Sequence, residues 1–410
     1  MSQYKDYCDI IKFAKLTKSL IVAPFELYSV WCNNDCDFCY LKNVMRKTPP
    51  ELKTYQLLKD KAIEWFKSNA QEIASSNITI NLRLIGGEIF ALPEEYYEVY
   101  RELLDTYYKI GKEYGIKINV NSSTNLMYAR EYVEKVAEIY DFCKQRDMTP
   151  DIIVSYYICG RFRNEEITEL WYQNTKYLSQ LIKDLVSTEI LLTKPSINEY
   201  LEDKDTYGVR YFRKVLSEQS IFSVSFNDNY QPYNEESMWL IPTHEENVSF
   251  FKKIYDEYPT LPWFSIFKGD FNEKTYDKDS KVRRFRGCSN IVFGLEDITN
   301  NDLPVRLLKG EFVYAQPNCA MRHMFWKDDN KPSSTLIDNK PLVEHGYNCL
   351  EKFECVNAFW NNVIGCGICK YKSLCYSKNL VGCYQRQQLN YVPNKCWKKE
   401  MFKYINENHG

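Results

Sequence analysis

Three cysteines with short, regular spacing lie near the N-terminus and have the clearest chemical potential in the chain. Cys32, Cys36 and Cys39 are separated by three and then by two residues. With 15 cysteines among 410 residues, this spacing is expected by chance only about 0.02 times in such a chain. Three thiolates on one tight loop suit three corners of an iron-sulfur cube and leave the fourth iron without a protein ligand. Zinc is the alternative metal for such a loop.

A second motif, Gly86-Gly87-Glu88, follows a predicted apolar strand. Glycines have no Cβ atom, so the backbone can come close to a ligand, and the neighbouring carboxylate can accept hydrogen bonds from an ammonium group. Alone, this tripeptide is equally typical of a turn. Combined with the cysteine triplet, it indicates that the two motifs serve one site.

The composition sets limits on the partners and the compartment. The formal net charge is -2, which gives no broad attraction to nucleic acid or to an anionic membrane. Lys5, Asp6 and Asp9 interrupt any apolar N-terminal stretch, so we predict no signal peptide and no membrane span. We therefore expect a cytoplasmic protein. In that reducing compartment, 15 cysteines and only four histidines indicate cysteine metal ligands rather than disulfides.

The hydrophobic pattern alternates between strands and helices along the first two thirds of the chain. Strands are predicted over residues 20–30, 78–85, 116–121, 151–157, 188–193 and 222–226. Helices are predicted over 54–75, 94–114, 130–146, 165–185 and 246–258. This alternation predicts a parallel sheet with ligands at the carboxyl ends of its strands, where both motifs fall. The pattern alone allows either a partial barrel or an open doubly wound sheet.

The triplet, with Phe38 before its last cysteine and Tyr40 after it, resembles the signature of the radical S-adenosylmethionine (radical SAM) enzymes. Gly86-Gly87-Glu88 is similar to the motif with which that family meets the amino group of SAM. The resemblance implies a partial (β/α)6 parallel barrel and a catalytic 4Fe-4S cluster on Cys32, Cys36 and Cys39. It also implies SAM bound through its amino and carboxylate groups to the open iron. One electron from a flavodoxin- or ferredoxin-type reductant then yields methionine and a 5′-deoxyadenosyl radical.

Further contacts to SAM follow from the same resemblance. Thr124-Asn125 is similar to the family's turn that approaches the SAM ribose, with Leu126 where the family often has glycine. Ser155 corresponds to a serine of the fourth strand that faces SAM, and Arg163 would pair with the SAM carboxylate. A plain polar turn and a surface arginine are the alternatives. No residue is assigned as the general base.

Nine of the fifteen cysteines follow Gly287, and their spacing resembles the SPASM extension of radical SAM enzymes. That extension holds one or two auxiliary 4Fe-4S clusters. By this resemblance the outer cluster is held by Cys366, Cys369, Cys375 and Cys396. The inner cluster is held by Cys288, Cys319 and Cys383, with Cys349, Cys355 or an open iron completing it. A zinc ribbon built on Cys366 and Cys369 is the alternative.

These patterns predict four segments: an N-terminal extension over 1–19, a radical SAM barrel over 20–270, a linker over 271–287, and a cysteine-rich, loop-rich auxiliary domain over 288–410. The linker is locally basic. It is either a solvated loop or a docking point for an acidic peptide. The remaining cysteines, Cys8, Cys143 and Cys159, match no motif and are expected to be small buried residues.

SPASM-bearing relatives mostly modify peptides and proteins, so the resemblance implies a post-translational peptide maturase that forms a crosslink, an oxidised residue or an epimer. A separate leader-binding protein is a possible partner. Formylglycine formation of the anaerobic sulfatase-maturase type is a second hypothesis, weakened because Ala320 and Ser289 stand where an aspartate base is expected. A small-molecule substrate stays open. The third hypothesis is a zinc or iron-sulfur protein without SAM chemistry.

Overall fold

One eight-stranded sheet organises the computed structural model, which describes residues 11, 14–15, 18–25, 31–39, 48–159, 161–227, 239–268, 290–293, 313–315 and 396–409. The strand order is β6-β5-β4-β3-β2-β1-β7-β8. The strands are β1 (Ser19–Ala23), β2 (Thr79–Leu84), β3 (Ile118–Thr124), β4 (Thr149–Tyr156), β5 (Val186–Leu191), β6 (Phe222–Asn227), β7 (Asn290–Phe293) and β8 (Val313–Ala315).

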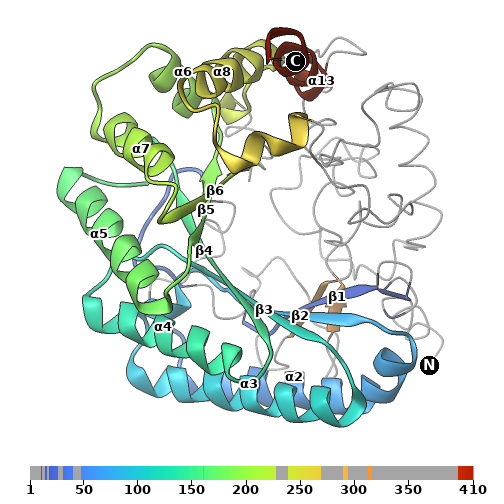
Figure 1. The fold of residues 1–410 in the computed structure, drawn as a ribbon. Helices are drawn as coiled ribbons and strands as arrows, with labels where there is room; N and C mark the ends of the chain where they lie inside the picture. The colour runs from blue at the N-terminus through green and yellow to red at the C-terminus, as the bar shows by residue number, and fades with distance from the viewer. Residues whose placement is uncertain are drawn as a thin grey trace, which may run out of the picture.

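Helices connect the strands and lie along the outside of the curved sheet (Figure 1). They are α2 (Leu52–Ser75), α3 (Glu94–Tyr114), α4 (Arg130–Lys144), α5 (Glu165–Ile182), α6 (Lys194–Leu201), α7 (Tyr207–Ser217), α8 (His244–Glu257) and α13 (Trp397–His409), with short 3-10 turns η3 (Ile89–Ala91) and η5 (Pro262–Phe267). Neighbouring helices pack on one another, as α2 does on α3 and α4 on α5.

The order of the first six strands decides between the two architectures that the sequence allowed. β1 to β6 are adjacent in chain order, and every pair among them is parallel. A doubly wound sheet must reverse its strand order, so that its helices cover both faces. Here successive right-handed crossovers in one direction place the helices on one face. The predicted parallel α/β sheet is therefore confirmed, and its arrangement fits a partial barrel.

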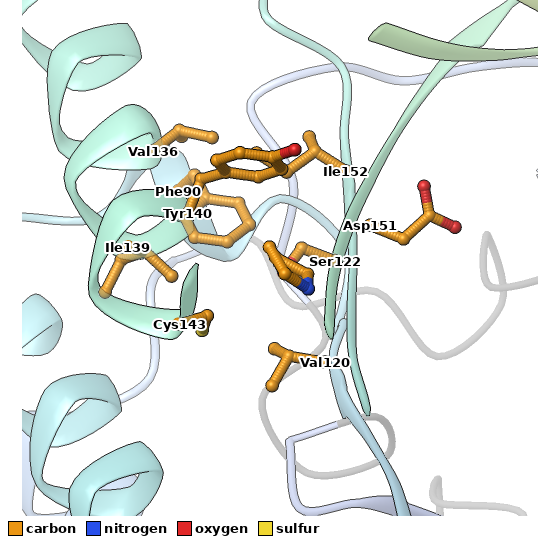
Figure 2. A pocket seen from close by; sticks show the side chains of 10 residues that line it. Phe90, Val120, Ser122, Val136, Ile139, Tyr140, Cys143, Asp151 and Ile152 are labelled. Carbon is orange, nitrogen blue, oxygen red and sulfur yellow. The ribbon is translucent and has the colours of Figure 1, made fainter. Parts of the chain in front are cut away.

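The two faces of this sheet differ in polarity. Along β2 and β3 every second residue is buried, and the buried set that includes Leu82 and Val120 belongs to the hydrophobic core. Figure 2 shows Val120 and Ile152 turned toward α4, whereas the Asp151 carboxylate points to the opposite side of the sheet. We call that opposite side the inner face. On β2 to β5 its polar residues include Asn81, Arg83, Asn119, Asn121, Ser123, Asp151, Ser155, Ser187 and Glu189, and the apolar Ile153 and Leu191 lie among them.

Several boundaries differ from the sequence prediction for local reasons. β1 ends at Ala23 instead of continuing through residue 30, because Pro24, in a turn, has no N–H to donate to a ladder. β3 continues to Thr124, so residues 122–124 are strand and not turn. The irregular sixth unit contains α6, with a proline in its first turn, and α7, capped by Thr206.

Described segments beyond residue 287 extend the six-stranded parallel sheet or pack on its helices. β7 pairs in parallel with β1, and β8 pairs antiparallel with β7, so both extend the same sheet. α13 packs on α8 and η5, as Figure 1 shows at the end of the chain. Trp397 stacks on Phe251 with ring centroids 4.3 Å apart. The predicted linker over 271–287 lies outside the described residues, and the division into domains stays a prediction.

Candidate functional site

The cysteine loop follows β1 and is fixed against the end of β2. Trp31 forms a parallel bridge with Gly87, and the Glu88 N–H donates to the Trp31 carbonyl at 2.7 Å. Gly87 has φ +78°, and a Cβ atom there would lie 2.1 Å from the Trp31 carbonyl oxygen. The sequence suggested that the glycines admit a ligand. In the structure, the space at Gly87 admits the Trp31 backbone, which leads directly into Cys32, and the contact of the glycines with a ligand stays a prediction.

Asparagine side chains tie the same loop to the loops after β3 and β4. The Asn33 amide donates to the Met127 carbonyl at 2.9 Å and accepts from the Asn125 amide at 2.7 Å. The Asn34 amide donates to the Arg161 carbonyl at 2.9 Å. The segments after β1, β2, β3 and β4 therefore meet around the cysteines, at the carboxyl edge where a parallel sheet binds ligands.

The same amides donate to two of the cysteine sulfurs. The Asn34 backbone N–H lies 3.4 Å from Sγ of Cys32, and its side-chain amide lies 3.0 Å from Sγ of Cys36. The Asn125 amide lies 3.6 Å from Sγ of Cys32. Burial raises the pKa of Cys32 to about 12, with the charge of Glu88 acting in the same direction. Burial also raises the pKa of Cys36, against the opposing effects of Arg161 and Asn34.

The donor set fits an iron-sulfur cluster in its chemistry. Cys32, Cys36 and Cys39 share one loop, and the Cys39 N–H donates to the Cys36 carbonyl at 3.1 Å in a tight turn. N–H donors aimed at sulfur are the groups that tune such clusters. In the described parts of the chain, no three His, Cys, Asp or Glu side chains are gathered closely enough to hold a metal ion. Cluster binding therefore requires the three thiols to lose their protons and converge.

Glu88 is buried beside the loop, with 1% of its surface exposed. One carboxylate oxygen accepts from the Thr124 hydroxyl at 2.9 Å, and the other accepts from the Asn125 backbone N–H. Burial raises the pKa of Glu88 to about 7, against these two hydrogen bonds and the charge of Arg161. Thr124, expected near the SAM ribose, also lies 2.8 Å from the Tyr128 hydroxyl. In this structure Thr124 supports Glu88.

An arginine that the sequence analysis did not select lies at this site. Arg161, in the loop between β4 and α5, is 9% exposed, and among the described residues its Nε has no hydrogen-bond partner. Its guanidinium lies 6.0 Å from the centre of the Phe38 ring. Arg163, the predicted partner of the SAM carboxylate, is exposed. Both residues follow a strand in a loop without periodicity, so the sequence contained no signal to distinguish them.

The other described residues that the sequence singled out lie next to the cysteine loop, on the inner face of the sheet, or in the hydrophobic core. Phe38 packs on Tyr157 with ring centroids 4.2 Å apart, and Ser155 lies on the inner face in register with Glu189. Leu126, at the position where the family often has glycine, has φ +50°, which explains a preference for glycine there. Cys143 is fully buried, as predicted, whereas Cys159 is half-buried.

Of the predicted auxiliary ligands only Cys396 is described; it directly precedes α13. The others lie outside the described residues: Cys288, Cys319, Cys349, Cys355, Cys366, Cys369, Cys375 and Cys383. The auxiliary clusters and their ligands therefore stay predictions. Among the described helices, none combines the length and apolar character that a membrane span requires.

Comparisons with known proteins add little to this geometry. No protein-family model matches the chain, and no curated protein matches it. Among the solved structures that match is methylornithine synthase (PylB), with 12% sequence identity and a TM-score of 0.28. The match covers 82% of this chain and 85% of that one. At this TM-score the match supports no conclusion about function, which must be argued from the residues themselves.

Proposed function

We propose that this protein is a radical SAM enzyme that modifies a peptide or protein substrate. The observation that carries the proposal is the cysteine loop itself. Its three cysteines have the spacing of that family, two of its sulfurs accept N–H hydrogen bonds, and Trp31 fixes it against Gly87 and Glu88. A zinc site would explain the cysteines but not the buried Glu88 and Arg161 beside them.

The chain's own residues provide binding groups for both ends of the methionine part of SAM. The Glu88 carboxylate accepts hydrogen bonds from Thr124, from the Asn125 N–H and from the Phe90 backbone. A carboxylate has about four acceptor sites, so one is left for an ammonium group. Arg161 is buried, and its Nε has no hydrogen-bond partner in the part of the chain that the structure describes, so it is available to bind the carboxylate. A cluster held by Cys32, Cys36 and Cys39 would supply the electron that cleaves SAM to a 5′-deoxyadenosyl radical.

The peptide substrate is inferred from the cysteine pattern of residues 288–396, which resembles that of peptide-modifying relatives. We place an external flavodoxin- or ferredoxin-type reductant at the start of the reaction. We place one or two auxiliary clusters on the C-terminal cysteines, where they would accept the electron left after hydrogen abstraction or bind substrate. Phe38, Tyr157 and the partly buried Leu191 form an apolar lining near the loop, which helps exclude water from a radical.

The test is anaerobic reconstitution with iron and sulfide, followed by assay of 5′-deoxyadenosine under a strong reductant. We expect Cys36→Ala to abolish 5′-deoxyadenosine formation, since one of the three cluster ligands is lost. Cys143→Ala is the matched control, because Cys143 lies on α4, which covers the side of the sheet opposite to the inner face (Figure 2). If Cys36→Ala still forms 5′-deoxyadenosine, or if the protein binds zinc tightly and does not cleave SAM, the proposal is wrong.

A further inference from the structure

The inner face of the sheet is unusually polar for parallel strands, which normally read as continuous hydrophobic runs because both of their faces are buried. Asn81 donates to Ser19 at 2.8 Å and accepts from Asn119 at 3.0 Å. Asp151 accepts from Ser187 at 2.7 Å. The hydrogen bonds of these side chains run from strand to strand across the inner face. Apart from Ile153 and Leu191, this face is therefore polar on β2 to β5.

Two opposite charges on this face have no ion-pair partner among the described residues. Arg83 of β2 makes no hydrogen bond or ion pair with any described residue. Glu189 of β5 makes no ion pair with any described residue. Glu189 accepts a hydrogen bond from Asn227, and burial raises its pKa against the effects of Asn227, Arg83 and Arg161. Asp151 accepts two such hydrogen bonds, from Ser187 and, at 3.5 Å, from Asn121.

Arg83 and Glu189 influence each other although β3 and β4 separate their strands. In a flat sheet three strand spacings would put β2 and β5 about 14 Å apart. The curvature of the sheet turns the inner sides of these strands toward each other (Figure 1). A guanidinium and a carboxylate thus face the same space without forming an ion pair. The charge of Arg161, in the loop after β4, acts to lower the pKa of both Glu189 and Cys36.

We propose that the inner face binds a dipolar group of the substrate, with a carboxylate at Arg83 and an ammonium at Glu189. This inference rests on the proposed function, because it names the chemistry of the substrate that the same site would position. Opposite charges at Arg83 and Glu189 favour a ligand that carries both a negative and a positive group. A ligand with a single charge would leave the other of these two side chains desolvated and unpaired. The group is either a free amino acid or a peptide segment with a basic and an acidic side chain.

The test is calorimetric titration of the full-length protein with defined probes. The dipolar probes are glycine, 4-aminobutanoate and 6-aminohexanoate; hexanoate and hexylammonium carry one charge each. We expect at least one dipolar probe to bind about tenfold or more tightly than both single-charge probes. Arg83→Gln and Glu189→Gln should each weaken that binding about tenfold or more. Arg101→Gln and Glu165→Gln, at exposed ion pairs on the outer helices, should leave it unchanged.

A blocked tripeptide, acetyl-Lys-Gly-Asp-amide, distinguishes a peptide ligand from a free amino acid. If the tripeptide binds more tightly than the free amino acids, the dipolar group belongs to a peptide segment. If it binds more weakly, the dipolar group is a free amino acid. Equal binding of dipolar and single-charge probes to the wild-type protein overturns the inference, and so does unchanged binding in both inner-face variants. The wild-type comparison holds even if a variant fails to fold. Iron content and 5′-deoxyadenosine are measured separately. Binding of a dipolar probe without SAM cleavage rejects only the proposed function. SAM cleavage without binding of a dipolar probe rejects only this inference.

Discussion

Gly87 and Gly115 have similar backbone conformations in very different surroundings. Their φ angles are +78° and +69°, but a Cβ atom at Gly87 would meet the Trp31 carbonyl, whereas one at Gly115 would meet nothing within 4 Å. We expect Gly115→Ala to cost about 1–2 kcal/mol, the ordinary cost of a left-handed conformation. Gly87→Ala should cost more than about 3 kcal/mol, because the backbone must also move. Chemical denaturation of both variants measures the difference.

The same substitution at Gly87 should also reduce the iron bound on reconstitution, because it displaces the start of the cysteine loop. Gly115→Ala should bind as much iron as the wild type. Equal losses of stability and of iron in the two variants would show that the close contact with Trp31 is not what fixes the loop.

Glu189 offers a pH-dependent readout of the inner face. Burial, with a smaller contribution from Asp151, raises its pKa above the ordinary value of 4.5, and Asn227, Arg83 and Arg161 oppose the rise. The folded state therefore keeps this proton when the unfolded state has already released it. Stability must then fall as pH rises above 4.5 toward the folded pKa. We expect the wild type to lose stability relative to Glu189→Gln as the pH rises from 4.5 through the raised pKa of the folded state.

Urea denaturation of the metal-free protein across this range checks the prediction. Glu165→Gln, at an exposed glutamate on the first turn of α5, is the control and should follow the wild type at every pH. Parallel stability curves for Glu189→Gln and the wild type would contradict a raised pKa at Glu189.

At the scale of elements, α13 completes an aromatic cluster on the sixth unit. Trp397 is 2% exposed and stacks on Phe251, and Phe402 packs on Phe267 with ring centroids 4.8 Å apart. Removing the Trp397 side chain leaves a cavity in this cluster, so we expect Trp397→Ala to destabilise the protein by about 3–5 kcal/mol. Trp239, 62% exposed, is the matched control, and Trp239→Ala should change stability by less than about 0.5 kcal/mol.

Urea unfolding of the two tryptophan variants decides this point. If both variants have the stability of the wild type, α13 does not contribute to the folded core in solution, and its contact with α8 has little energetic importance.

At the scale of the whole molecule, the proposed metal centres should respond to mutation independently. The predicted three clusters correspond to about twelve irons per chain, at four irons per cluster. We expect Cys36→Ala and Cys369→Ala each to lower this number by about four, since each removes one predicted ligand set. Only Cys36→Ala should abolish 5′-deoxyadenosine formation.

Iron analysis and product assay on the same anaerobic samples measure both quantities. A Cys369→Ala variant with unchanged iron would remove the support for an outer cluster on the C-terminal cysteines. Loss of 5′-deoxyadenosine in Cys369→Ala would instead show that the two regions depend on each other.

The sequence predicted long elements well and short or distant features poorly. The helix over 94–114 was predicted with both ends as observed, because its apolar face is long and Gly115 provides a left-handed C-cap. Helices α6 and α7 are too short for their periodicity to be clear. The Asn33 and Asn34 contacts join the loops after β3 and β4, and Arg161 is distinguished from Arg163 only by burial. Such tertiary contacts leave no periodic trace in the sequence.

The position of α13 has a consequence for how the protein is made. About 140 residues separate the end of α8 from the start of α13, and a ribosome adding 5–20 residues each second needs about 7–28 s to synthesise them. During that interval the rings of Phe251, Trp263 and Phe267, which Trp397 later covers, lack their partner on the nascent chain. The first units can assemble early, but the sixth unit lacks the cover of α13 until translation has passed residue 409.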